Sequence, residues 1–186
     1  MLPVLPRLPE VYDLIKVNLS FIIHAPRQSG KTTLLKSLTA TINSSGERHA
    51  SYRYLEALDG VKHRKDGIIE IENKMFTALL EEGYVDSEKF IEEFKSLPPL
   101  TSTTKVKYFL NYIRAKLDKP LIILFDEADR VSEEPLIILL REIRLGYIKR
   151  YDRKDKLSFP SSIALIGMRD IRDYLTKTRP EKACDF

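Results

Sequence analysis

The sequence predicts an α/β fold in which a mainly parallel β-sheet forms the middle of three layers. Short apolar runs alternate along the 186-residue chain with longer segments of helical character. The clearest run, residues 121–125, is apolar throughout, as expected for a strand that is buried on both faces. The length suits one domain with a sizeable core. We therefore expect a single domain over residues 1–186, in which residues 1–18 lead into the first strand.

The apolar runs and their helical neighbours can be assigned in order along the chain. Strands are expected at residues 19–24, 52–58, 121–125 and 163–166. Helices are expected at 30–42, 68–82, 87–95, from 102, at 134–150, and from 170. In the helix from 102, Val106, Leu110, Ile113 and Leu117 recur at helical spacing and form one apolar face.

Composition narrows the functional classes. The single cysteine, Cys184, provides neither a disulfide framework nor a metal cluster. No run of about 18 uncharged apolar residues occurs, so we expect no membrane span and a cytoplasmic location. The net charge is +4. Basic residues gather at 62–65 and 149–156; a solvated loop is the simpler interpretation of each, and a nucleic-acid contact stays open as the alternative.

A phosphate-binding pattern lies between the first strand and its helix. The residues are Ala25, Pro26, Arg27, Gln28, Ser29, Gly30, Lys31 and Thr32, followed by Thr33. This is the Walker A pattern with alanine in place of its first glycine. Successive backbone N–H groups of such a loop, and the N-terminus of the helix after it, bind phosphate oxygens. We expect all nine residues to contact ATP.

Three residues of this loop have separate tasks. Gly30 lets the backbone approach the phosphates because it has no Cβ atom. Lys31 is expected to reach the β- and γ-phosphates and to assist catalysis. The hydroxyl of Thr32 is expected to ligate Mg²⁺.

An acidic cluster follows the third strand. Asp126 and Glu127 come directly after the apolar run, and Asp129 follows. This is the Walker B pattern, in which Asp126 is expected to hold Mg²⁺ through water. Glu127, one residue beyond the strand, is expected to act as the general base on the attacking water. The alternative is an acidic turn that caps the next helix.

The fourth strand runs into Gly167, Met168, Arg169 and Asp170. Arg169 is our candidate for a catalytic sensor of the γ-phosphate, because a guanidinium suits developing phosphoryl charge. A surface turn is the alternative. Arg141 and Arg144, one helical turn apart, are interpreted as a solvated face, with a role as an arginine finger as the alternative.

Three blocks, residues 24–33, 121–129 and 163–174, resemble prokaryotic AAA-like ATP-binding proteins, which are similar to AAA+ and STAND-type ATPases. STAND ATPases often carry an arginine where this chain has Arg169. The resemblance implies a sheet of order 5-1-4-3-2 and a helical lid after the fifth strand. The chain ends 16 residues after Asp170. We therefore expect strand 5 and the lid to be missing, as in a truncated nucleotide-binding domain, with the first strand at the sheet edge.

Other nucleotide-dependent classes fit less well. Residues 126–129 spell Asp-Glu-Ala-Asp, the motif of DEAD-box helicases. Those proteins usually carry Thr-Gly where this chain has Arg27 and Gln28, and Ser-Ala-Thr where it has residues 167–169. A GTPase is disfavoured because no Asn-Lys-x-Asp motif is present.

The sequence therefore predicts an enzyme, an ATPase that binds ATP and Mg²⁺. Hydrolysis would drive a conformational switch or remodel a protein partner, and oligomerisation stays open. One alternative is an ATP-binding scaffold or sensor with negligible hydrolysis. Another is a nucleic-acid-stimulated, helicase-like ATPase.

Overall fold

A computed structural model describes the greater part of the chain. The described residues are 9–24, 26, 29–55, 64–83, 89, 92–93, 102–131, 133–152 and 159–167. The helix expected from residue 170 lies outside them, and the helix expected at 87–95 lies almost wholly outside them.

In the described part of the chain, four strands form one parallel sheet. They are β1 (Phe21–His24), β2 (His49–Tyr54), β3 (Leu121–Asp126) and β4 (Ser162–Gly167). Their order across the sheet is β1-β4-β3-β2, and every neighbouring pair is parallel. The expected order 5-1-4-3-2 is confirmed for strands 1-4-3-2, and the described residues contain no fifth strand. Among the described strands, β1 and β2 are the outer ones and β3 and β4 are central.

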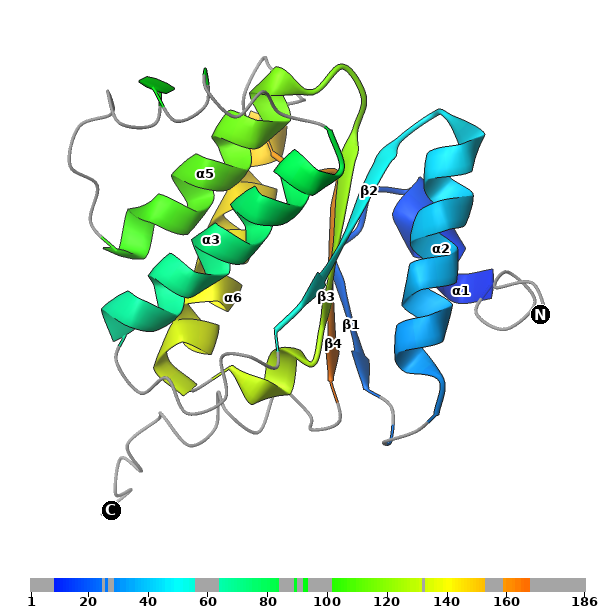
Figure 1. Cartoon of the computed structure of the whole chain (residues 1–186), viewed down its shortest axis with the longest axis horizontal. Coiled ribbons are helices and arrows are strands. Elements are labelled where there is room, and N and C mark those ends of the chain that lie inside the picture. Colours follow the sequence, from blue (N-terminus) through cyan, green and yellow to red (C-terminus); the bar gives the residue numbers. More distant parts are fainter. Residues whose placement is uncertain are drawn as a thin grey trace, which may run out of the picture.

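Helices cover both faces of this sheet, so the three-layer prediction is confirmed (Figure 1). α1 (Pro9–Lys16) and α2 (Lys31–Ser45) lie on one face. α3 (Arg64–Glu81), α5 (Ser102–Lys116) and α6 (Glu133–Asp152) lie on the other. A short 3-10 helix, η2 (Ala128–Arg130), connects β3 to α6. Within the described residues, no helix has both the length and the apolar character needed to cross a bilayer.

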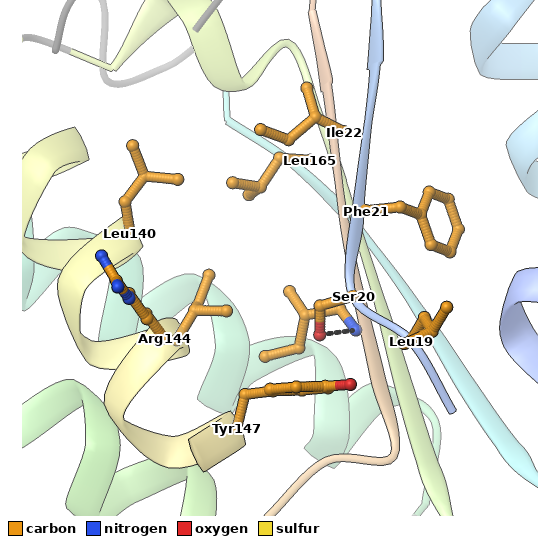
Figure 2. Close-up of a pocket in the computed structure, with 10 residues that line it drawn as sticks. Leu19, Ser20, Phe21, Ile22, Leu140, Arg144, Tyr147 and Leu165 are labelled. Atoms are coloured by element: carbon orange, nitrogen blue, oxygen red, sulfur yellow. Dashed lines mark hydrogen bonds between the residues drawn. The ribbon is translucent and has the colours of Figure 1, made fainter. Parts of the chain in front are cut away.

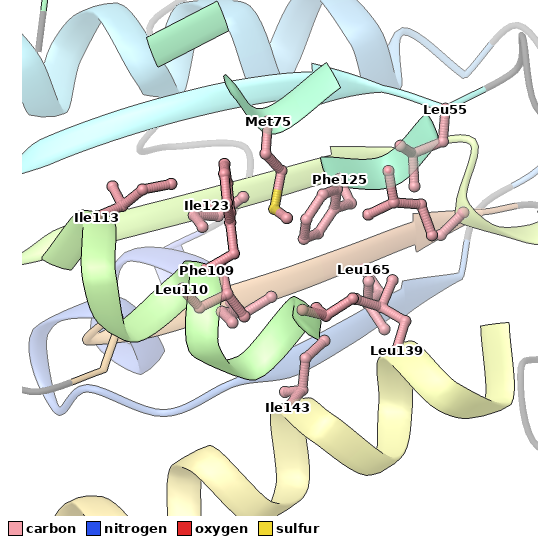
Figure 3. Close-up of a cluster of buried hydrophobic side chains, with 14 of the residues drawn as sticks. Leu55, Met75, Phe109, Leu110, Ile113, Ile123, Phe125, Leu139, Ile143 and Leu165 are labelled. Carbon is pink, nitrogen blue, oxygen red and sulfur yellow. The ribbon is translucent and has the colours of Figure 1, made fainter. Parts of the chain in front are cut away.

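The alternation of side chains along each strand divides the core in two. On β3, Ile123 and Phe125 pack with α3, α5 and α6 in the larger cluster (Figure 3). Ile122 and Leu124, which point the other way, pack with α1 and α2. Because successive side chains alternate, Asp126 continues the row that faces α2. The pleat of β3 thus decides on which face the acidic residue lies.

Element boundaries differ from the expectations mainly at β2 and α1. β2 begins at His49, three residues earlier than expected, because Asn43 at the end of α2 fixes its start. The Asn43 side chain donates to the Ala50 carbonyl at 2.9 Å and accepts from the Ala50 N–H at 2.7 Å. α1 lies within residues 1–18, where no helix was expected. Val11 and Ile15, four residues apart, bury one face of this short helix against the sheet.

Arg150 corrects the interpretation of the basic cluster at 149–156 as a solvated loop. It is only 6% exposed. Its guanidinium donates to the carbonyls of Ser161 at 2.6 Å and Asn18 at 2.8 Å. This residue therefore ties the end of α6 to the segments that enter β4 and β1.

Gly146 provides a test of the packing of α6. A glycine inside a helix lowers stability by about 1 kcal/mol relative to alanine. A Cβ atom at position 146, however, would lie 2.1 Å from the ring of Phe159, which is 2% exposed. We expect Gly146→Ala to destabilise the fold by about 1–2 kcal/mol, because overpacking outweighs the gain in helix propensity. Urea denaturation measures this, with the exposed Arg141→Ala on the same helix as control. A Gly146→Ala variant more stable than wild type would show that Phe159 does not pack there.

Candidate nucleotide-binding site

The two sequence motifs meet at the carboxyl ends of the strands. β1 and β3 end on the same side of the sheet because they run parallel, and α2 begins there. Ligand sites of open α/β sheets lie outside the carboxyl ends of the strands. The fold thus places the start of α2, with Lys31 and Thr32, beside the acidic end of β3, as the motifs predict.

The described part of the loop is held together by hydrogen bonds to one carbonyl. The carbonyl of Pro26 accepts a bond from the Ser29 hydroxyl at 2.8 Å and another from the Lys31 ammonium at 3.2 Å. Lys31 is 9% exposed, so its long side chain lies over the loop and not in open solvent. Ala25, Arg27 and Gln28 lie outside the described residues, and their predicted contacts with ATP stay predictions.

Gly30 and the start of α2 form a surface suited to an anion. Gly30 has a φ of 81°, a left-handed conformation that favours glycine. A Cβ atom there would meet nothing within 4 Å, so the space over this residue is open. No side chain of the described residues caps the N-terminus of α2. The first N–H groups of a helix and its dipole attract anions. Thr33 lies exposed in the first turn.

One hydrogen bond joins the two motifs. The Thr32 hydroxyl donates to Oδ2 of Asp126 at 2.7 Å, across 94 positions of sequence. Asp126 is completely buried. Because the hydroxyl proton is committed to the carboxylate, the lone pairs of the Thr32 oxygen are available to a cation. The donor set at this point consists of hard oxygens, which Mg²⁺ prefers.

Tyr52 is a site residue that sequence reasoning missed. Its phenol donates to the same Oδ2 of Asp126 at 2.9 Å. Burial raises the pKa of the Tyr52 phenol, and the hydrogen bond to Asp126 raises it further, so the phenol keeps its proton. A weak signal existed in the sequence, because a strand that pairs with β3 places alternate side chains on the face of Asp126.

Glu127 begins the turn after β3 in a strained conformation. Its φ of 54° is uncommon for any residue other than glycine. Its backbone N–H donates to Oδ1 of Asp126 at 3.0 Å, which ties the turn to the buried carboxylate. Its Oε2 atom lies 3.6 Å from Nε of Arg130, an ion pair three positions apart. Sequence reasoning did not single out Arg130, although this spacing of opposite charges was a usable signal.

Asp129 packs against the end of β4. A Cβ atom at Gly167 would lie 2.5 Å from Oδ1 of Asp129, so only glycine permits this approach. The turn after β3 and the exit of β4 are therefore in direct contact. Arg169, the predicted sensor, lies outside the described residues.

A separate hollow lies between β1 and α6, on the face opposite α2 (Figure 2). Its volume is about 340 Å³, and its walls are mainly apolar, with Ile22, Leu140 and Leu165 among them. Arg144 lines it, so this arginine borders an apolar groove and does not share the face of Asp126. The hollow is distinct from the site formed by Thr32 and Asp126.

Comparison with known proteins relates the fold to solved structures. No family model matches the sequence, and no curated protein matches it. The chain is similar to a chain in a structure of Drosophila ORC bound to poly(dA/dT) DNA and Cdc6, with a TM-score of 0.52 and 10% identity. The match covers 96% of this chain and 26% of that one.

Two structures of the Aeropyrum pernix ORC2 protein also match. One is of its ADPNP-ADP complexes and the other of its ADP form. Each has a TM-score of 0.48 and 16% identity. These matches cover 94% and 96% of this chain and 44% of each ORC2 chain. The chain thus spans less than half the length of each of these three chains. At these identities, the likeness to the Drosophila structure shows a shared fold.

Proposed function

We propose that the chain binds ATP with Mg²⁺ at the junction of α2 and β3 and hydrolyses it. The observation that carries this proposal is the hydrogen bond from Thr32 to Asp126, because it unites a phosphate-binding loop and an acidic strand end in one site. Neither motif alone is as specific as the two in contact.

The loop of residues 25–33 and the start of α2 would bind the phosphates. Backbone N–H groups in the first turn of α2 would donate to phosphate oxygens. The Lys31 ammonium, which here donates to a neutral carbonyl, adds a charged donor. Gly30 leaves the space that the phosphates need.

Thr32 and Asp126 are the residues that would hold Mg²⁺. The buried carboxylate and the lone pairs of the hydroxyl oxygen fit a hard cation. When bound, the ion neutralises negative charge on the phosphate oxygens. Asp126 also holds the turn that contains Glu127, through the backbone N–H of that residue.

Glu127 is the proposed general base. It lies directly after the metal-binding carboxylate, and its side chain is 16% exposed, so water reaches it. The ion pair with Arg130 favours a second candidate function, ATP binding with negligible hydrolysis, because it holds the Glu127 carboxylate against a guanidinium and not toward an attacking water. Arg169 stays the proposed sensor. The cycle would switch the conformation of the chain or remodel a protein partner.

Lys31→Ala tests where the nucleotide binds. Loss of a charge-assisted donor is expected to weaken ATP binding by about 10–100-fold. Isothermal titration calorimetry measures the affinity. Lys119→Ala is the control, because Lys119 precedes β3 and so lies at the opposite end of that strand from Asp126. Unchanged affinity in Lys31→Ala would place the nucleotide elsewhere.

Glu127→Gln separates hydrolysis from binding. We expect ATP affinity to be retained and turnover to fall by about 10²–10⁴-fold, the usual contribution of a general base. Phosphate release measures turnover, and Glu47→Gln, an exposed carboxylate in the loop after α2, is the control. Equal turnover in wild type and Glu127→Gln would contradict the role of Glu127. Binding without turnover in both would favour the scaffold or sensor function.

A further inference from the structure

We propose that Tyr52 is a positioning residue that holds the carboxylate of Asp126 in the orientation needed for the metal ion. The inference rests on the proposed function, since it concerns the same Mg²⁺ site. It adds a residue from β2, a strand to which neither sequence motif belongs.

The carboxylate of Asp126 is fixed at both oxygens. Two hydroxyl donors, Thr32 at 2.7 Å and Tyr52 at 2.9 Å, converge on Oδ2. The backbone N–H of Glu127 bonds to Oδ1 at 3.0 Å. A buried charge requires such donors, because the interior cannot replace its hydration. Three donors from three separate segments define one orientation of the side chain.

Tyr52 differs from Thr32 in how its hydroxyl is placed. Thr32 belongs to the first turn of α2, beside the phosphate loop, and its oxygen is itself the expected metal ligand. Tyr52 is held by the sheet, where it pairs in register with Leu124 of β3. Its ring packs against the core under α2, and the Lys36 ammonium lies 5.6 Å from the ring centre.

Packing therefore locates the phenol, whether or not a ligand is bound. Thr32 contributes to binding the ion directly, whereas Tyr52 acts only through Asp126. Groups that orient a metal ligand in this way typically change metal affinity by 10–100-fold when they are removed. Tyr52 thus holds the Asp126 carboxylate in its metal-binding orientation before the ion binds.

Tyr52→Phe removes the hydroxyl and leaves the ring in the core. Tyr54→Phe is the matched control, because it makes the same change two residues along the strand, at an exposed position. Binding of AMP-PNP is measured by calorimetry in EDTA and with Mn²⁺, and bound Mn²⁺ is counted by electron paramagnetic resonance. We expect Tyr52→Phe to bind Mn²⁺ about 10-fold more weakly in the presence of AMP-PNP. Its affinity for AMP-PNP in EDTA should equal that of wild type, and Tyr54→Phe should match wild type throughout.

The EDTA measurement also excludes a general structural effect, because a damaged fold would lower nucleotide affinity without metal as well. If wild type gains affinity from Mn²⁺ and Tyr52→Phe gains as much, the positioning role is wrong and the proposed function stands. If wild type binds no AMP-PNP, or binds it equally with and without Mn²⁺, the Mg²⁺-nucleotide site is wrong and the inference falls with it.

Discussion

The buried carboxylate of Asp126 is the constraint around which the site is organised. A carboxylate with no exposed surface must receive hydrogen bonds, or its ionised form would strongly destabilise the fold. The donors come from the start of α2, from β2 and from the turn after β3. Satisfying one charge therefore brings together three segments that lie far apart in the sequence. The described strands all run parallel and therefore end on the same side of the sheet, and the order β1-β4-β3-β2 places β2 beside β3.

The same arrangement explains why the turn after β3 is strained and tightly packed. Glu127 adopts a positive φ while its N–H is bound to Asp126, and Asp129 closes against Gly167 at the end of β4. Strained residues of this kind persist only where the surroundings hold them, and they are common at functional sites. Glu127 is thus held at its backbone by the Asp126 carboxylate and at its side chain by Arg130. The proposed general base and the proposed metal ligand are therefore linked by a hydrogen bond.

Periodicity and motif spacing predicted the central features well. The apolar run at 121–125 indicated a strand buried on both faces, and the two motifs placed Thr32 and Asp126 together. The polar strand β2 was harder to place from the sequence, because its start depends on hydrogen bonds from the Asn43 side chain to the backbone of Ala50. A strand pattern does not contain this contact. Tyr52 was missed for a related reason, because its role follows from the register between β2 and β3 and is not visible in local sequence. Arg150 was misassigned because its partners are carbonyls, which a charge pattern does not reveal.

The central claim is that a divalent ion and a nucleotide share the junction of α2 and β3. Paramagnetic broadening of backbone amide signals locates such an ion directly in the isotopically labelled protein. The account predicts that Mn²⁺ with ADP broadens the signals of Gly30, Thr32 and Glu127 first, with weaker effects farther along α2. Broadening centred on another part of the sheet, or none beyond that of free Mn²⁺, would contradict it.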